Sequence, residues 1–363
     1  MKSSNLVIKS GSLLVLFSIL QVSLQLVEPL NATQKPGPKK RSLAIHRNEK
    51  PKTDVIIAPR LTSGKVIAQA RETMVPRIEE MPKMTSKNRG SIVFLGDASP
   101  SMGEVLNHGK FNGTLAEFVK DALKNTMAEI VEASKSDDGG LKHNADIAAF
   151  SYYHSVDNGG NRSTLVDPVL PTMPVGGSPL DLARALNPSE VATESIKFEH
   201  SSEGATPMKY ALGKMVEHYK EWAINTPRHS RRGKDLARLF SLVHLSDGES
   251  KDGNPHESIK ALAKEVKDNG DELLVTNVHV SARVNKELLF PTYEEVKALN
   301  DPYALSMYEM SSPMPEDVAK TLDDGIIANW QERRMFCLNV SDLEHLVEAL
   351  KAASSTVLAL PSS

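Results

Sequence analysis

The sequence SIVFLGDASPSMG, residues 91–103, decides the fold. It begins with the apolar residues 92–95, a run typical of a buried strand, and then changes abruptly to small and polar residues. Asp97, Ser99 and Ser101 follow at alternate positions, so the end of one strand brings three oxygen-bearing side chains to one edge of a sheet. Mg²⁺ prefers oxygen ligands of this kind in proteins. The stretch therefore predicts a divalent-cation site.

The overall composition is that of a folded protein body without a disulfide framework. The chain has 363 residues, of which 40% are hydrophobic and 25% charged, and these fractions are typical of soluble globular proteins. Cys337 is the only cysteine, which excludes an intrachain disulfide and a zinc site made of cysteines. Because it lies in an apolar run, we expect a buried structural thiol.

Residues 1–84 differ in character from the rest, and we expect them to form a leader outside the folded body. Residues 1–90 carry 16 lysines and arginines against 6 acidic residues, whereas the remainder carries 27 against 40. From residue 34 onward the leader is rich in proline and lysine, which is typical of a disordered linker. It has almost no aromatic residues that could stack on bases, so we expect no specific nucleic-acid binding.

Residues 13–27 form an apolar run within this leader, and the sequence leaves its role open. A run of about fifteen residues is shorter than the roughly 20 that a membrane span needs. Its length and the lysines before it suit a signal-peptide core, but no convincing cleavage site follows. Alternatively, the run belongs to an upstream extension and the true start lies near Met74 or Met84. We expect a cytoplasmic protein; the alternative is an exported or membrane-associated one, with membrane contact only through the leader.

Beyond residue 84, apolar patterns typical of strands and of helices alternate along the chain. Strands are expected at residues 92–95, 145–153, 164–170, 239–245, 273–280 and 335–339. Helices are expected at residues 111–134, 180–186, 208–222, 255–268, 316–330 and 341–353. Strands that are apolar throughout indicate a parallel sheet covered on both faces. The pattern predicts an α/β fold over residues 85–353: a doubly wound, Rossmann-like sheet, mostly parallel with one antiparallel edge strand, helices on both faces, and a flexible tail at 354–363.

Three separated pieces of this pattern carry polar residues at the expected strand and helix ends. Asp97, Ser99 and Ser101 follow the first strand, Thr206 lies just before the helix that starts at residue 208, and Asp247 follows the strand at 239–245. In doubly wound folds, ligands bind beyond the carboxyl ends of the strands. Each residue alone could be an ordinary cap or turn residue. Together, in this order and context, they favour one binding site.

The pieces at residues 97–101, 204–207 and 246–248 resemble the von Willebrand factor type A family. The metal-ion-dependent adhesion site of that family is built from an Asp-x-Ser-x-Ser loop, a later Thr and a later Asp. The resemblance covers roughly residues 85–353, almost all of the expected body. It implies a module that binds protein partners through a divalent metal ion and has no catalytic activity of its own.

The resemblance also implies a role for each site residue. Ser99 and Ser101 would bind the metal through their hydroxyls, Thr206 directly or through water, and Asp97 and Asp247 mainly through water. Mg²⁺ suits such a site because it retains several waters; Mn²⁺ and Ca²⁺ are alternatives. One metal position stays open for an Asp or Glu side chain of a partner protein.

The sequence pieces ASPSMG, GATPM, HLSDGES and DPYALSMYEMSSPMPEDV resemble a narrower group within that family. These are solitary bacterial A-domain proteins, found alongside protein phosphatases and kinases in stress and tellurium-resistance gene clusters. The finer resemblance implies a regulatory or assembly role in a bacterial complex, with a protein phosphatase or kinase as a candidate partner. Pro100 departs from the family pattern, in which a small residue stands between the two serines, and it should stiffen the loop.

The alternative function is a metal-dependent phosphatase similar to the haloacid dehalogenases. Those enzymes also place a nucleophilic Asp at the end of a first strand and a metal-binding Asp later, roles that Asp97 and Asp247 could fill. They need a second acid two residues after the nucleophile, where this sequence has Ser99. A serine cannot act as the general acid or base near neutral pH, so we expect binding and not catalysis.

Overall fold

The computed structural model describes residues 73–108, 111–136, 138–156, 162–170, 196, 198–201, 204–281, 283–284, 286–320, 322 and 329–339. Contacts within the chain divide it into two units, residues 1–67 and 68–363, and all described residues belong to the second. The expected apolar run at 13–27, the helices at 180–186 and 341–353, and the tail at 354–363 lie outside the described residues.

The described residues build a seven-stranded sheet in the order β10-β11-β9-β8-β1-β4-β5. Its strands are β1 (Gly90–Asp97), β4 (Ala145–Val156), β5 (Arg162–Pro168), β8 (Leu239–Ser246), β9 (Glu272–His279), β10 (Leu288–Leu289) and β11 (Phe336–Leu338). The first strand, β1, lies inside the sheet and pairs in parallel with β4 on one side and β8 on the other. This order confirms the expected doubly wound, mostly parallel sheet, in which later strands are added on the other side of β1.

Both edges of the sheet are antiparallel, where the sequence predicted one antiparallel edge strand. β5 pairs antiparallel with β4, and β10 pairs antiparallel with β11. β10 consists of two residues only, which is too short to produce a recognisable alternation of apolar and polar residues.

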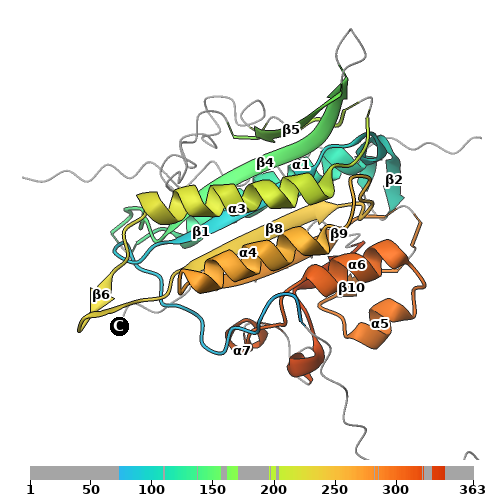
Figure 1. Ribbon diagram of the computed structural model, residues 1–363. Helices are drawn as coiled ribbons and strands as arrows, with labels where there is room; N and C mark the ends of the chain where they lie inside the picture. Colours follow the sequence, from blue (N-terminus) through green and yellow to red (C-terminus); the bar gives the residue numbers. More distant parts are fainter. Residues whose placement is uncertain are drawn as a thin grey trace, which may run out of the picture. The chain divides into compact units, whose positions relative to one another are not determined.

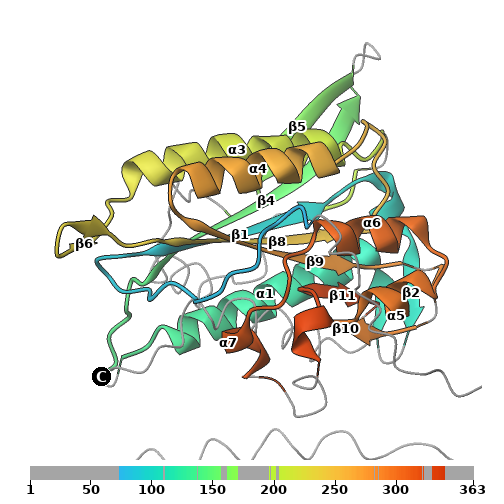
Figure 2. The ribbon, with the colours of Figure 1, turned by 60° about the horizontal axis from the view of Figure 1, so that its bottom comes forward.

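Helices cover both faces of the sheet, as expected (Figures 1 and 2). The helices are α1 (Leu115–Ala133), α3 (Met208–Asn225), α4 (His256–Asp268), α5 (Tyr293–Lys297), α6 (Pro302–Met310) and α7 (Glu316–Ala319). A hydrophobic core lies on each face of the sheet, and alternate residues of β1 belong to one or the other. Ile92 and Phe94 pack with α1, and Val93 and Leu95 pack with α3 and α4. Burial on both faces explains why β1 is apolar at consecutive positions.

Two helices differ from the expected ranges. The residues at the expected start of the first helix instead form the strand β3 (Phe111–Thr114), which pairs with β2 (Val105–His108) in a hairpin. The helix α1 begins only at Leu115. Thr114 and Glu117 close a reciprocal capping box there, which fixes the start of the helix. The helix expected at 316–330 is also shorter in the described residues: α7 ends at Ala319, and a separate short 3-10 helix, η3, spans Trp330–Glu332.

The packed body begins before the residue expected from the sequence. Val75, Ile78, Met81 and Met84 are buried in the two cores. Arg77 donates a hydrogen bond of 2.8 Å to the Met314 carbonyl. Residues 75–84, which we assigned to the leader, therefore pack with the body.

A second short hairpin, β6 (Ser230–Arg231) with β7 (Lys234–Asp235), lies at the opposite end of the sheet from β2 (Figure 1). None of the helices in the described part of the chain is long and apolar enough to cross a membrane.

Candidate metal site

The ends of β1 and β8 meet at Asp97. This residue closes β1 and is fully buried. The Ser99 backbone N–H donates to Asp97 Oδ1 over 2.9 Å, and the Ser246 hydroxyl donates to Asp97 Oδ2 over 2.8 Å. Both carboxylate oxygens are therefore held in place by donors from two neighbouring strand ends.

The two serines after Asp97 lie close together in a short 3-10 helix, η1 (Pro100–Gly103), and the residue that caps it. Ser99 Oγ and Ser101 Oγ are 3.0 Å apart. Adjacent oxygen ligands in an octahedral Mg²⁺ site with bonds of about 2.1 Å lie about 3.0 Å apart. The serine pair thus has the spacing of two neighbouring magnesium ligands. Pro100 occupies the first helical position, where its fixed φ fits without strain.

The electrostatics of the site favour a bound cation. Burial raises the pKa of Asp97 to about 7, and the nearby charge of Asp247 adds to the effect, whereas hydrogen bonds from Ser99 and Ser246 oppose it. Among the described residues, no lysine or arginine forms an ion pair with either carboxylate. A buried carboxylate that is repelled by a second, partly buried one is stabilised by a cation between or beside them. The donor set therefore fits a divalent metal ion.

Thr206 joins the site through its backbone. It is buried, and its carbonyl accepts a hydrogen bond of 2.9 Å from the Lys251 N–H, in the loop that carries Asp247. Asp252 of the same loop accepts hydrogen bonds from Lys209 N and Tyr210 N in the first turn of α3. The loop and the start of α3 are thus tied together, and Thr206 lies between them.

The structure therefore brings together Asp97, Ser99, Ser101 and Asp247 by hydrogen bonds and electrostatic interaction, and links Thr206 to the Asp247 loop. Their roles as metal ligands stay predictions. Within the described part of the chain, no group of three or more His, Cys, Asp or Glu side chains is placed to hold a metal. The candidate site is of another kind, because most of its predicted metal ligands are serine and threonine hydroxyls.

Sequence reasoning missed the buried residues beneath the site. Tyr152 lies opposite Asp97 in the pairing of β4 with β1. Burial and the charge of Asp97 raise its pKa well above the usual value for tyrosine. Its hydroxyl lies 2.9 Å from His244 Nε2, and His244 Nδ1 lies 2.8 Å from Asn277 Oδ1. Since Asn277 Nδ2 donates to Ser311, its Oδ1 accepts from His244, and Nε2 is left to accept from Tyr152.

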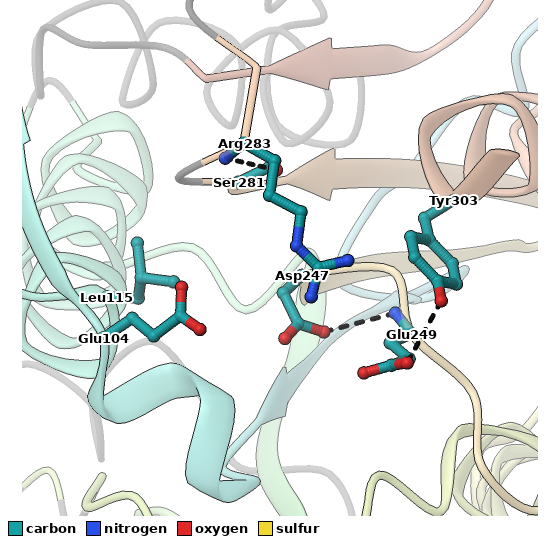
Figure 3. A pocket seen from close by; sticks show the side chains of 7 residues that line it. All are labelled: Glu104, Leu115, Asp247, Glu249, Ser281, Arg283 and Tyr303. Atoms are coloured by element: carbon teal, nitrogen blue, oxygen red, sulfur yellow. Dashed lines mark hydrogen bonds between the residues drawn. The ribbon is translucent and has the colours of Figure 1, made fainter. Parts of the chain in front are cut away.

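A small pocket opens beside the site (Figure 3). Its lining residues are Glu104, Leu115, Asp247, Glu249, Ser281, Arg283 and Tyr303. The Tyr303 hydroxyl donates to Glu249 Oε1 over 3.0 Å, and the Arg283 side chain extends toward Asp247. Arg283 comes from the turn after β9, so three neighbouring strands contribute to this edge of the sheet. No pattern in the sequence pointed to Arg283 as a residue of this pocket.

No protein-family model matches this sequence, and no curated protein matches it. Among solved structures, the pilus adhesin SpaC from Lactobacillus rhamnosus GG matches with 14% identity and a TM-score of 0.40, over 76% of this chain and 31% of that one. The mussel byssus protein PTMP1 with a zinc-occupied MIDAS motif matches with 15% identity and a TM-score of 0.28, over 55% and 37%. Human Sec24c of the COPII coat matches with 14% identity and a TM-score of 0.32, over 63% and 28%.

This chain thus spans less than half of each of these three structures. We base no functional conclusion on similarities of this size.

Proposed function

We propose that this chain binds a divalent metal ion at the edge of its sheet and uses it to bind a protein partner. The observation that carries the proposal is the pair of carboxylates of Asp97, which is fully buried, and Asp247, which is partly buried; their charges repel each other beside two serine hydroxyls at magnesium-ligand spacing. An arrangement that raises the pKa of a carboxyl group to about 7 is costly for stability. Such a cost is typical of functional sites.

The candidate site residues would hold the ion in different ways. Ser99 and Ser101 supply hydroxyl oxygens, and Thr206 supplies a third from the start of α3. Asp97 is fixed by Ser99 and Ser246, so that its oxygens can accept hydrogen bonds from metal-bound water. Asp247, which follows the neighbouring strand β8, can accept such hydrogen bonds as well. Mg²⁺ is the first candidate, and Mn²⁺ and Ca²⁺ are alternatives. The bound ion would supply positive charge and an open position for a partner's Asp or Glu carboxylate.

The finer parts of the proposal rest on the resemblance of the sequence to bacterial solitary A-domain proteins. On that basis we propose a regulatory or assembly role, with a protein phosphatase or kinase as the partner. The compartment, cytoplasmic or exported, depends on residues 13–27, which lie outside the described residues.

A metal titration tests the site directly. Mg²⁺ or Mn²⁺ is expected to raise the melting temperature of the protein, because a ligand that binds only the folded state stabilises it. Asp97→Ala should remove this response, and Ser101→Ala should shift it to higher metal concentration. A melting temperature that does not respond to either metal in the unchanged protein would rule out the site. Pull-downs with and without a chelator then test whether partner binding needs the metal.

We also propose that the chain binds without catalysing a reaction. Ser99 stands where a phosphatase of the alternative class needs an acid, and its N–H is bonded to Asp97 Oδ1. Phosphatase turnover by the purified protein that disappears in Asp97→Asn would overturn this view.

A further inference from the structure

The turn after β9 is held against the metal-site loops by its backbone. Val280 N donates to the Ser246 carbonyl over 3.0 Å, one residue before Asp247. Ser281 N donates to Asn339 Oδ1 over 2.6 Å, and Arg283 N donates to Ser281 Oγ over 3.2 Å. The Arg283 backbone is thus linked to Ser281, and Ser281 to Asn339, beside the loop that carries Asp247.

The Arg283 side chain is directed into the pocket beside the site, where it lies over the Tyr303 ring. Its guanidinium lies 5.8 Å from the centre of the Tyr303 ring, a cation–π distance, and it extends toward Asp247 in Figure 3. Among the described residues, the guanidinium makes no hydrogen bond and no ion pair within 4 Å. An arginine offers five N–H donors in a planar fork that matches a carboxylate.

The carboxylates nearby do not use these donors. Glu249 is already paired with Lys251 and accepts the Tyr303 hydroxyl. Tyr303 thereby holds Glu249 with its hydroxyl while its ring lies beside Arg283. The geometry leaves the guanidinium open to a group that arrives from outside.

The charge balance of the pocket makes Arg283 important for the binding of an anionic partner. Four carboxylates lie in and below the pocket, from Asp97, Glu104, Asp247 and Glu249, against the cationic side chains of Lys251 and Arg283. A divalent ion brings this set to neutrality. Without Arg283 it would stay negative even with the metal bound, and it would repel an acidic partner.

We infer that Arg283 determines partner specificity, and that the partner presents two neighbouring carboxylates. One would reach the metal and the other would accept hydrogen bonds from the Arg283 guanidinium. The inference rests on the proposed function, since the first carboxylate needs the metal. The Arg283 guanidinium would add a second contact to the partner, and this contact would favour a pair of adjacent acidic residues over a single one.

Three short peptides test the inference on the full chain at saturating Mg²⁺. They carry Asp-Asp, Asp-Asn or Asn-Asn between flanking glycines, and NMR titration gives their affinities. Asp-Asp is expected to bind about tenfold more tightly than Asp-Asn, the size of one charge-assisted contact. Arg283→Gln should weaken the binding of Asp-Asp more than that of Asp-Asn, so that the ratio of the two affinities falls to about one, while a metal-induced shift in melting temperature persists. Arg283→Lys should restore part of the ratio, because lysine keeps the charge but not the fork.

Arg231→Gln is the matched control, since Arg231 is an exposed arginine in β6, at the other end of the sheet. It should behave like the unchanged protein. If Arg283→Gln keeps the preference for Asp-Asp, the inference is wrong while the proposed function stands. If neither acidic peptide binds better than Asn-Asn, or if a chelator has no effect on their binding, the proposed function fails and the inference fails with it.

Discussion

The Ser246 hydroxyl donates a hydrogen bond of 2.8 Å to Asp97 Oδ2, across 149 positions of sequence. The same hydroxyl accepts a hydrogen bond of 3.0 Å from Gly248 N. One small side chain therefore fixes the carboxylate at the end of β1 and shapes the turn that carries Asp247. The two halves of the candidate metal site depend on each other through Ser246.

Ser246→Ala should weaken both stability and metal binding. The change removes a donor from a buried carboxylate, which should raise the pKa of Asp97 further and make its ionised form less available to a metal. It also leaves Gly248 N without its acceptor, and a loss of roughly 1–3 kcal/mol in the free energy of unfolding is expected. Urea denaturation and metal titration measure the two effects. Ser241→Ala is the control, because Ser241 is equally buried in β8 but its hydroxyl has no hydrogen-bond partner among the described residues; an equal loss there would refute the role of Ser246.

Gly248→Ala should displace the turn that carries Asp247. Gly248 has a φ of +83°, and an added Cβ would lie 2.9 Å from His279 Cε1 and 2.9 Å from Tyr303 Cβ. Backbone strain and this contact together should cost roughly 2–4 kcal/mol and reduce metal affinity. Gly139→Ala provides the comparison, since Gly139 has a φ of +81° and nothing within 4 Å of the added Cβ. Thermal melts of both variants should separate backbone strain from the close contact, and equal losses would show that the contact is unimportant.

The central fold was predictable because the signal is local. Each strand of the sheet interior is apolar at consecutive positions, and each long helix repeats its apolar residues at helical spacing. The strands that follow β1 are added first on one side of it (β4) and later on the other (β8), and the parallel pairing of β1 with β8 places Asp97 near Asp247. The edges were less predictable: β10 has two residues, and the β2–β3 hairpin carries a pattern that continues into α1.

The candidate site was predictable where its residues lie at the ends of strands or, like Thr206, just before a helix. Asp97, Ser99, Ser101 and Asp247 could be found this way, because the sequence changes from apolar to polar there. Arg283 could not, since it lies in an irregular turn whose position depends on hydrogen bonds to distant residues such as Asn339. Tyr152 and Ser246 have clear strand positions, but their contacts with the site depend on strand register, which a single sequence does not reveal.

His218 should make the protein less stable in mild acid. It is buried in α3 with its ring centre 5.0 Å from that of Phe150, and burial lowers its pKa to about 4. The unfolded chain, with a histidine pKa near 6.5, binds the proton more tightly. Stability is therefore complete above about pH 6.5 and falls as the pH decreases toward 4, by about 2 kcal/mol at pH 5.

His218→Leu should abolish this loss. The difference in melting temperature, variant minus unchanged protein, should therefore increase as the pH is lowered from 7.5 to 5. Contributions from other groups, such as His244 and Asp97, are common to both proteins and cancel in the difference. His229→Leu, outside the helices and strands, serves as the comparison. A pH-independent difference for His218→Leu would contradict the assignment.

Asp97→Asn should make the metal-free protein more stable at pH 8 while removing its response to metal. The folded pKa of about 7 lies above the unfolded value near 3.8, so ionised Asp97 destabilises the fold progressively as the pH rises from about 4 to 7 and fully above that. Asparagine is neutral throughout, keeps an acceptor for Ser99 N, and no longer repels Asp247. We expect a gain of roughly 1–3 kcal/mol at pH 8 in chelator, shrinking toward zero near pH 4. Urea denaturation at both pH values measures this gain in the free energy of unfolding.

A variant less stable than the unchanged protein at pH 8 would mean that the Asp97 carboxylate stabilises the fold. The electrostatic argument for the metal site would then be wrong. A more stable variant that ignores Mg²⁺ would show that this carboxylate is kept at a cost in stability because the bound ion needs it.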